Sequence, residues 1–147
     1  MENREKMWFE LVKYYGLKEI PGTDKNNPII LQWFQEMGFT GIKDDETSWC
    51  SLTINVMAKR LGLSYTGKLN ARSWLDIGKE TKTPQLGDVV VFWRNKKNSW
   101  EGHVGLFAGI SIDNKILVLG GNQGNMIDIA AYPIVSPTFG LLGYREL

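Results

Sequence analysis

One cysteine and one histidine stand where they could work together as a nucleophile and a base. Cys50 is predicted to begin a helix and His103 to begin a strand, and each is the sole residue of its type. The thiolate is the reactive form of cysteine, a helix N-terminus favours negative charge, and a nearby imidazole can take the thiol proton. The pair could therefore attack a carbonyl carbon at neutral pH, although a free cysteine more often serves as a small buried hydrophobe.

Composition excludes several other kinds of site. A single cysteine cannot form an internal disulfide, and with a single histidine there is no Cys/His set for a structural zinc ion, so we expect neither a metal nor a cofactor. The 17 basic and 16 acidic residues give a net charge of +1, too small to favour nucleic acid or an anionic membrane. No stretch approaches the roughly 18 apolar residues of a membrane span.

The length of 147 residues favours one domain, with residues 1–46 as an integral helical part of it. We expect a monomer, although the sequence does not settle the oligomeric state. The N-terminal segment MENREKMWFELVKYYG lacks the uninterrupted apolar core of a signal peptide. The expectation is synthesis in the cytoplasm without a Sec signal.

Helical spacing of apolar residues dominates the first half of the chain. It predicts helices at about residues 3–15, 28–37 and 49–61, and a short one at about 71–77. Asn27 and Pro28 suit the cap and first position of the second helix, and Thr47 or Ser48 suits the cap of the third. Cys50 then lies at the start of the core-facing stripe of that helix.

After Pro84 the pattern becomes extended, with β-branched and aromatic residues between turn signals. The predicted strands are DVVVFW, HVGLFAGI, KILVLGG, NMIDIAAY and a short last one at about 143–146. Helices followed by hairpin-connected strands predict an α+β domain, with the helices packed on an antiparallel sheet of about five strands.

A histidine that acts as a base needs a third group to orient it, and the predicted hairpin offers two. If the second and third strands pair across a turn at Ile112 and Asp113, His103 and Asn122 are about equally far from that turn and fall opposite each other. A one-residue bulge would bring Gln123 to the histidine instead.

Two tryptophans close to the pair are candidates for a substrate groove. Trp100 lies in the polar loop before His103, where its ring could stack on substrate. Trp49 directly precedes Cys50, but its apolar neighbours favour a place in the core. Asp88, at a turn into a strand, is more typical of a capping carboxylate than of a catalyst.

These motifs together resemble a family of small papain-like cell-wall peptidases of the CHAP and NlpC type, often phage-encoded. The resemblance is carried by EIPGTDKNNPII, DETSWCSLTINVMAKRLGL, ARSWL, PQLGDVVVFWR, GHVGLFAG and LVLGGNQGNMIDI. It implies a papain-like core and a site that combines Cys50, Gly87-Asp88, Gly102-His103 and Asn122. Many members carry a glutamate two positions before that asparagine, whereas this chain has Gly120.

The resemblance implies hydrolysis of amide bonds in the peptide part of bacterial peptidoglycan, by an N-acetylmuramoyl-L-alanine amidase or an endopeptidase that forms a thioester. Such an enzyme would reach the wall by holin-type release or dedicated secretion. Three alternatives stay open at this point: a catalytically silent wall-binding or phage structural module, a protein peptide bond as substrate, and a transferase acceptor. The sequence does not distinguish a phage lysin from a toxin aimed at competing bacteria.

Overall fold

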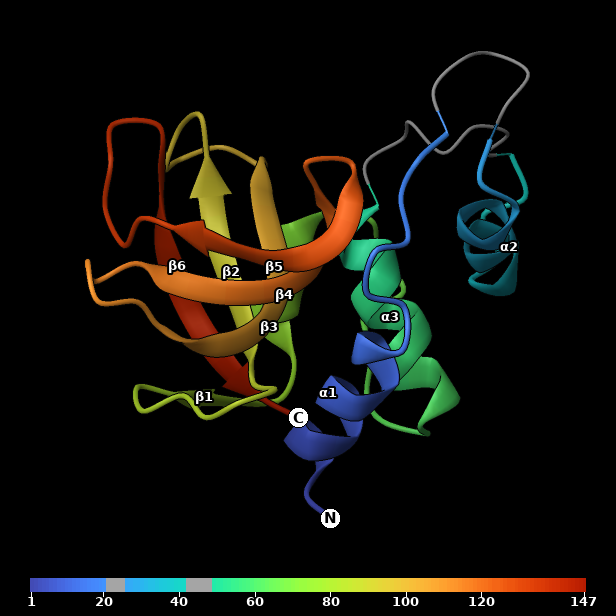
Figure 1. Cartoon of the computed structure of the whole chain (residues 1–147), viewed down its shortest axis with the longest axis horizontal. Helices are drawn as coiled ribbons and strands as arrows, with labels where there is room; N and C mark the ends of the chain where they lie inside the picture. Colours follow the sequence, from blue (N-terminus) through green and yellow to red (C-terminus); the bar gives the residue numbers. More distant parts are fainter. Residues whose placement is uncertain (21–25, 42–48) are drawn as a thin grey trace.

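The computed structural model describes residues 1–20, 26–41 and 49–147, and it places helices against one side of an antiparallel sheet (Figure 1). The helices are α1 (Asn3–Val12), α2 (Pro28–Glu36), α3 (Cys50–Arg60) and the 3-10 helix η1 (Ala71–Asp76). The strands are β1 (Lys79–Thr81), β2 (Val89–Arg94), β3 (Gly102–Ile110), β4 (Ile116–Gln123), β5 (Met126–Tyr132) and β6 (Phe139–Glu146). The α+β class predicted from the sequence is confirmed.

The sheet has six strands in the order β1-β6-β2-β3-β4-β5, so the prediction of about five strands was one short. The missing strand is β1, which has only three residues, Lys-Glu-Thr, and carries no apolar alternation. It pairs with the end of β6, where Lys79 lies opposite Glu146. The strand β6 itself begins at Phe139, four residues before the predicted start.

The predicted helices are present with shorter ends. Helix α1 stops at Val12, and the chain leaves it through turns that end at Gly16, whose φ of 91° suits glycine. The predicted cap of α2 is confirmed, because the Asn27 side chain accepts a hydrogen bond from the Ile29 amide at 2.9 Å.

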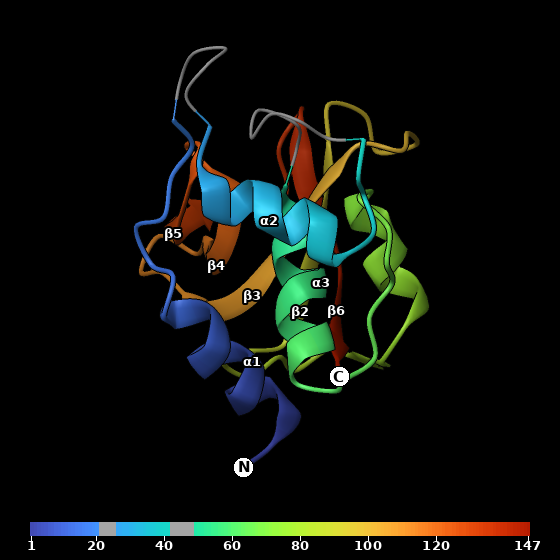
Figure 2. The same cartoon turned by 90° about the vertical axis from the view of Figure 1, so that its right-hand side faces the viewer.

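Helix α3 forms the middle layer of the molecule. Its residues from Cys50 to Ala58 are all buried, between the strands β3 and β4 on one side and the helices α1 and α2 on the other (Figure 2). This burial explains why the helix is apolar or small on nearly every side, without a clear amphipathic stripe. The nucleophile candidate therefore stands on the most enclosed helix.

Both faces of the sheet are covered near β2. Val89 and Val91 belong to the main core under α3, whereas Val90 and Phe92 belong to a smaller cluster on the opposite face. Side chains alternate between the two faces of a strand, so a fully buried strand reads as a continuous apolar run. The strand that leads to the site is thus anchored on both sides.

Candidate active site

Cys50 is the first residue of α3 and is almost fully buried, with 3% of its surface exposed. Trp49 occupies the cap position and supplies no side-chain hydrogen bond to the helix. The predicted caps, Thr47 and Ser48, lie outside the described residues. At this position the thiol is next to the backbone N–H groups of the first helical turn and the positive end of the helix dipole, which favour the thiolate.

The start of α3 is held against the sheet by a close backbone approach at Gly121 in β4. A Cβ atom at this position would lie 2.4 Å from Oγ1 of Thr53 and 2.7 Å from the ring of Trp49, so only glycine fits. Trp49 is fully buried here and its Nε1 donates to Oε1 of Glu19 at 2.6 Å. Trp49 is therefore not a groove residue, and of its two predicted places the core, which its apolar neighbours favoured, is the one it occupies.

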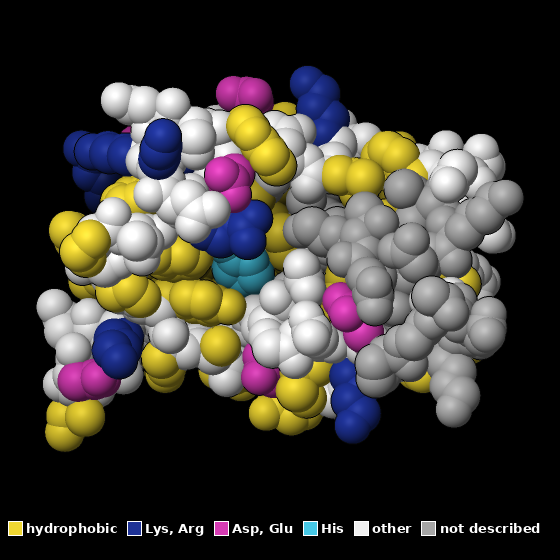
Figure 3. All heavy atoms as spheres, turned by 90° about the horizontal axis from the view of Figure 1, so that it is seen from above, with side chains coloured by type: hydrophobic (Ala, Val, Ile, Leu, Met, Phe, Trp, Pro, Cys, Tyr) yellow, Lys and Arg dark blue, Asp and Glu magenta, His cyan; other side chains and the backbone are white. Residues whose placement is uncertain are grey.

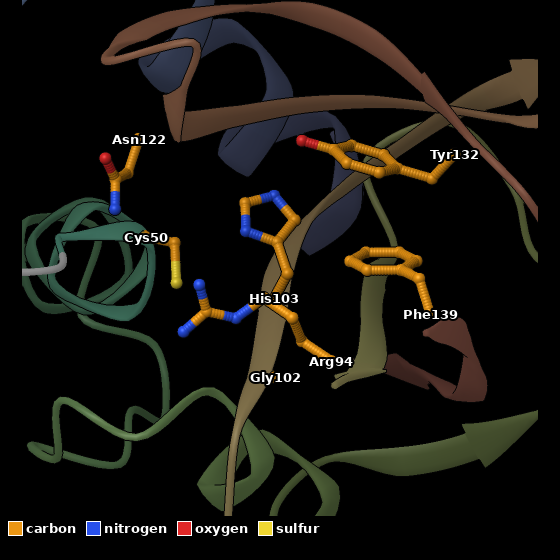
Figure 4. A pocket seen from close by; sticks show the side chains of 7 residues that line it. All are labelled: Cys50, Arg94, Gly102, His103, Asn122, Tyr132 and Phe139. Carbon is orange, nitrogen blue, oxygen red and sulfur yellow. The ribbon is translucent and has the colours of Figure 1, made fainter. Parts of the chain in front are cut away.

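His103 is the second residue of β3, and its ring lies between Cys50 and Gln123. Its Nε2 is 2.9 Å from Oε1 of Gln123, and a hydrogen bond links the ring to Cys50. Figure 4 shows the other ring nitrogen, Nδ1, directed toward the Cys50 sulfur. The structure thus brings together the predicted pair, which is 53 positions apart in the sequence.

The amide of Gln123 is fixed in one orientation by its other contacts. Its Nε2 donates to the carbonyl oxygen of Val118 at 3.1 Å, to that of Asp128 at 2.9 Å and to Oδ1 of Asp128 at 2.9 Å. All three partners are acceptors, so the opposite end of the amide, Oε1, must face the histidine. His103 then carries its proton on Nε2 and presents Nδ1 to the thiol.

The hydrogen bond to the ring goes to Gln123, the alternative that a bulge would favour. The register of β4 shifts between Gly120 and Gln123, and Asn122 has a φ of 57°. Asparagine tolerates this left-handed conformation, which changes the facing of the residues that follow. The prediction of Asn122 assumed a regular hairpin between the two strands and therefore did not include this irregularity. Asn122 lies in the same pocket, beside Cys50 (Figure 4).

Gly120 makes room for this arrangement. A Cβ atom at that position would lie 2.8 Å from Oε1 of Gln123. A glutamate at position 120, as the resemblance would have it, would therefore compete with the Gln123 amide for the same space. Glycine at position 120 therefore leaves free the space that the Gln123 side chain needs to reach His103.

The electrostatics of the pair favour a charged histidine. Burial is the largest influence and lowers the pKa of His103, but the hydrogen bond and charge of Cys50, with the hydrogen bond to Gln123, raise it more. The net effect is a pKa above the ordinary value of 6.5. This is the behaviour of a thiolate–imidazolium pair, in which each charge stabilises the other.

The pair opens onto a groove made of two adjoining pockets, seen as a hollow around the histidine in Figure 3. Cys50, Arg94 and Gly102 line both pockets. One is completed by His103, Asn122, Tyr132 and Phe139, and the other by Leu69, Asn70, Ala71 and Trp100. Trp100 is 73% exposed on this wall, a position compatible with substrate stacking, which stays a prediction.

A buried network on α3 supports the wall that contains Leu69 and Asn70. Oδ1 of Asn55 accepts hydrogen bonds from the backbone amides of Thr66 and Gly67, and its Nδ2 donates to the carbonyl of Lys68. Ser51, next to the nucleophile, donates to the same carbonyl at 2.7 Å. The loop therefore has a fixed position relative to Cys50.

Four residues of the site carried no usable signal in the sequence: Arg94, Asp128, Tyr132 and Phe139. Arg94 ends β2, and a charge at a strand end is ordinarily only a solvated residue. Tyr132 and Phe139 stack with their centroids 5.0 Å apart beside the His103 ring. Burial raises the pKa of Tyr132 far above its ordinary value, so its hydroxyl stays protonated.

The Gly87-Asp88 motif, which the resemblance places with the site, anchors helix α1. Asp88 is 1% exposed; its Oδ1 lies 3.0 Å from Nε of Arg4, and its Oδ2 accepts from the Gln85 amide. A Cβ atom at Gly87 would lie 2.0 Å from the Arg4 carbonyl oxygen. The capping role predicted for Asp88 matches this geometry.

Within the described residues there is no group of three His, Cys, Asp or Glu side chains that could hold a metal ion. None of the described helices is long and apolar enough to cross a membrane.

A family model described as the CHAP domain matches residues 42–122, which is 81 of the 147 residues. The matched segment contains Cys50, His103 and Asn122 and ends immediately before Gln123. No curated protein was found to match the chain.

Proposed function

The chain belongs to the CHAP domain family, whose members are typically peptidoglycan amidases or peptidases, and on that premise we propose a cysteine hydrolase that cleaves amide bonds in the peptide part of peptidoglycan. The observation that carries the proposal is the position of His103, hydrogen-bonded to Cys50 on one side and to Gln123 on the other. A nucleophile, a base and a group that orients the base are what covalent acyl transfer requires.

The reaction begins with attack of the Cys50 thiolate on the amide carbon. His103, charged beside the thiolate, gives its Nδ1 proton to the leaving amine, and a thioester with Cys50 forms. Water then attacks the thioester while His103, now neutral, takes a proton from that water. The acid is released and the thiolate–imidazolium pair returns. Gln123 keeps Nδ1 aimed at the sulfur throughout.

The oxyanion of each tetrahedral intermediate needs donors close to the sulfur. The backbone N–H of Cys50 at the helix start is one candidate. The side-chain amide of Asn122 is the other, because it lies beside Cys50 on the pocket wall (Figure 4). Asn122 thus has a catalytic role in this proposal that differs from orienting the histidine.

The substrate lies outside the cytoplasm, so the protein would act on the wall after holin-type release or dedicated secretion, and we propose that it does so as a monomer. Mass spectrometry of digested walls would identify the bond that is cut, which could lie next to the sugar-linked alanine or within the stem or cross-bridge.

The test compares the wild-type protein with Cys50→Ala and Cys50→Ser on purified peptidoglycan. New amine and carboxyl ends should appear with the wild type alone, while melting temperatures stay close, because both substitutions are small changes at a helix start. A serine hydroxyl is poorly activated by a site suited to a thiolate. Walls that are bound but not cut by the wild type would instead support the silent-module alternative.

A further inference from the structure

Arg94 lies where the two pockets beside Cys50 meet. It is the last residue of β2, its side chain is 51% exposed, and it lines both pockets. Figure 4 shows its guanidinium pointing toward Cys50 and lying next to His103. A basic side chain also borders the single histidine in the hollow of the space-filling view (Figure 3). A peptide bound across Cys50 would therefore contact this side chain.

The positive charge of Arg94 is not matched by an acidic residue on the groove walls. Among the described residues that line the two pockets there is no Asp or Glu. The ion pair of Arg94 is with Glu101, at 3.5 Å between Nη2 and Oε2, and the same Glu101 oxygen accepts from Asn95 at 2.7 Å. A guanidinium has five N–H donors, so one long contact leaves it able to bind another acceptor.

The positive charge of Arg94 lies near the side chains of Cys50 and His103. Arg94 and His103 line the same pocket, and the positive charge of Arg94 is one of the influences that lower the pKa of His103. A guanidinium binds a carboxylate through two parallel hydrogen bonds, a geometry that ammonium does not reproduce. An anionic group held there would be fixed relative to the sulfur.

We propose that Arg94 binds a free carboxylate of the substrate next to the scissile amide bond, so that the enzyme prefers peptides with this carboxylate over amidated ones. The peptide part of peptidoglycan contains such free carboxylates. The identity of the substrate rests on the proposed function, whereas the binding of a carboxylate beside Cys50 does not.

The first test uses two alkylating reagents that differ in the group to be recognised. Iodoacetate carries a carboxylate, iodoacetamide is its neutral amide, and both react with Cys50. The ratio of their rate constants cancels any change in thiolate population. We expect Arg94→Gln to lower the iodoacetate/iodoacetamide ratio about 3- to 10-fold, the range of a partly exposed ion pair.

Two further variants complete this test. Lys97→Gln removes one positive charge from the neighbouring β2–β3 loop, outside both pockets, and should leave the ratio unchanged. Arg94→Lys keeps the charge but loses the paired hydrogen bonds, so its ratio should be intermediate. An unchanged ratio in Arg94→Gln, or an equal fall in Lys97→Gln, would overturn the proposal. If Arg94→Gln does not fold, a wild-type ratio in Arg94→Lys would do the same.

The second test uses peptidoglycan whose free carboxylates have been converted to primary amides with carbodiimide and ammonium. The wild type should cut these walls about tenfold more slowly than untreated walls, and Arg94→Gln should cut both at the same low rate. Equal wild-type rates on both walls would contradict the proposal. A wild type that cuts neither wall would overturn the proposed function, while the alkylation ratio would still decide the role of Arg94.

Discussion

The side-chain amide of Gln123 decides which nitrogen of His103 faces the nucleophile. Three acceptors around its Nε2 fix the amide, and the fixed amide in turn fixes the imidazole. In the proposed reaction Asp128 would be a positioning residue one step behind Gln123, without contact to the reacting atoms. Such a chain of hydrogen bonds explains how an uncharged amide can hold a base in one tautomer.

Loss of Gln123 and loss of Asn122 should differ in a measurable way. Gln123→Ala removes the group that orients His103 and should lower kcat by roughly 10- to 10⁴-fold while alkylation of Cys50 persists. Because the bond to Gln123 raises the pKa of His103, the alkaline limb of the pH profile should move to lower pH. Asn122→Ala should lower kcat without that movement. A shift in Asn122→Ala alone would reverse the two roles.

The single histidine allows a direct titration by NMR. In the wild type its pKa should lie above 6.5, because the hydrogen bond and charge of Cys50, together with the hydrogen bond to Gln123, outweigh burial. In Cys50→Ala that partner is absent, burial becomes dominant, and the pKa should fall below 6.5. The ring protons of His103 report both values across pH. Equal pKa values in the two proteins would show that the pair does not exist.

The sequence was sufficient to predict the pair and to place Asn122, Gln123 and Trp100 near it, but not to decide which residue orients His103. The types and local context of Cys50 and His103 indicated a nucleophile at a helix start and a base on a strand. The third residue depended on a bulge at Asn122, and a left-handed residue has no reliable signature in a single sequence. Trp49 was a groove candidate only through its proximity in sequence to Cys50, and the core position that its apolar neighbours favoured is the one it occupies.

At the scale of elements, the site depends on how closely α3 approaches β4. Gly121 allows the strand backbone to touch the first turn of the helix, next to Trp49 and Thr53. The strand continues from that contact to Gln123, so one short segment positions both the helix that carries Cys50 and the amide that contacts His103.

Gly121→Ala should therefore damage both stability and activity. Its Cβ would overlap Thr53 and Trp49, and such overpacking costs about 1–3 kcal/mol. The helix start would have to move away from His103, so kcat should fall at temperatures where the variant is still folded. Gly143→Ala, where a Cβ meets Leu75 at an ordinary 3.5 Å, is the matched control. Full activity in Gly121→Ala would refute the positioning role.

Most helices and strands could be predicted from simple sequence patterns, whereas strand β1 and the groove wall could not. Apolar spacing and the Asn27-Pro28 cap located α2, and β-branched runs located β2 to β5. The short polar strand β1 exists because β6 offers it a partner, and such tertiary pairing leaves no local trace. The groove wall at Leu69 and Asn70 likewise depends on buried Asn55, whose role emerges only when the loop folds back on α3.

At the scale of the whole molecule, the ion pair of Arg4 and Asp88 joins helix α1 to the start of strand β2. Both side chains are buried, and Arg4 also contacts Glu146 at 2.8 Å near the end of the chain. The ion pair lies in a different part of the fold from the groove. It belongs to the stability of the domain and has no part in the chemistry proposed here.

Asp88→Ala should weaken the fold and leave catalysis unchanged. It leaves the buried Arg4 cation with only its outer partners, which for a broken buried pair costs about 3 kcal/mol. Urea unfolding would measure the loss, and kcat/KM on peptidoglycan at low temperature should equal that of the wild type. Asp113→Ala, in the exposed β3–β4 hairpin, should show neither effect. A large fall in kcat/KM for Asp88→Ala would place the motif in the reaction after all.

Because β6 lies between β1 and β2, it protects β2 from contact with other chains. Until β6 pairs with it, β2 is a sheet edge with the sequence VVVFW, rich in β-branched and aromatic residues and without a charge until Arg94. Exposed edges of this kind recruit strands from other chains. A chain cut before Phe139 should therefore accumulate as insoluble aggregate, so expression trials and fusion designs need to preserve the C-terminal strand.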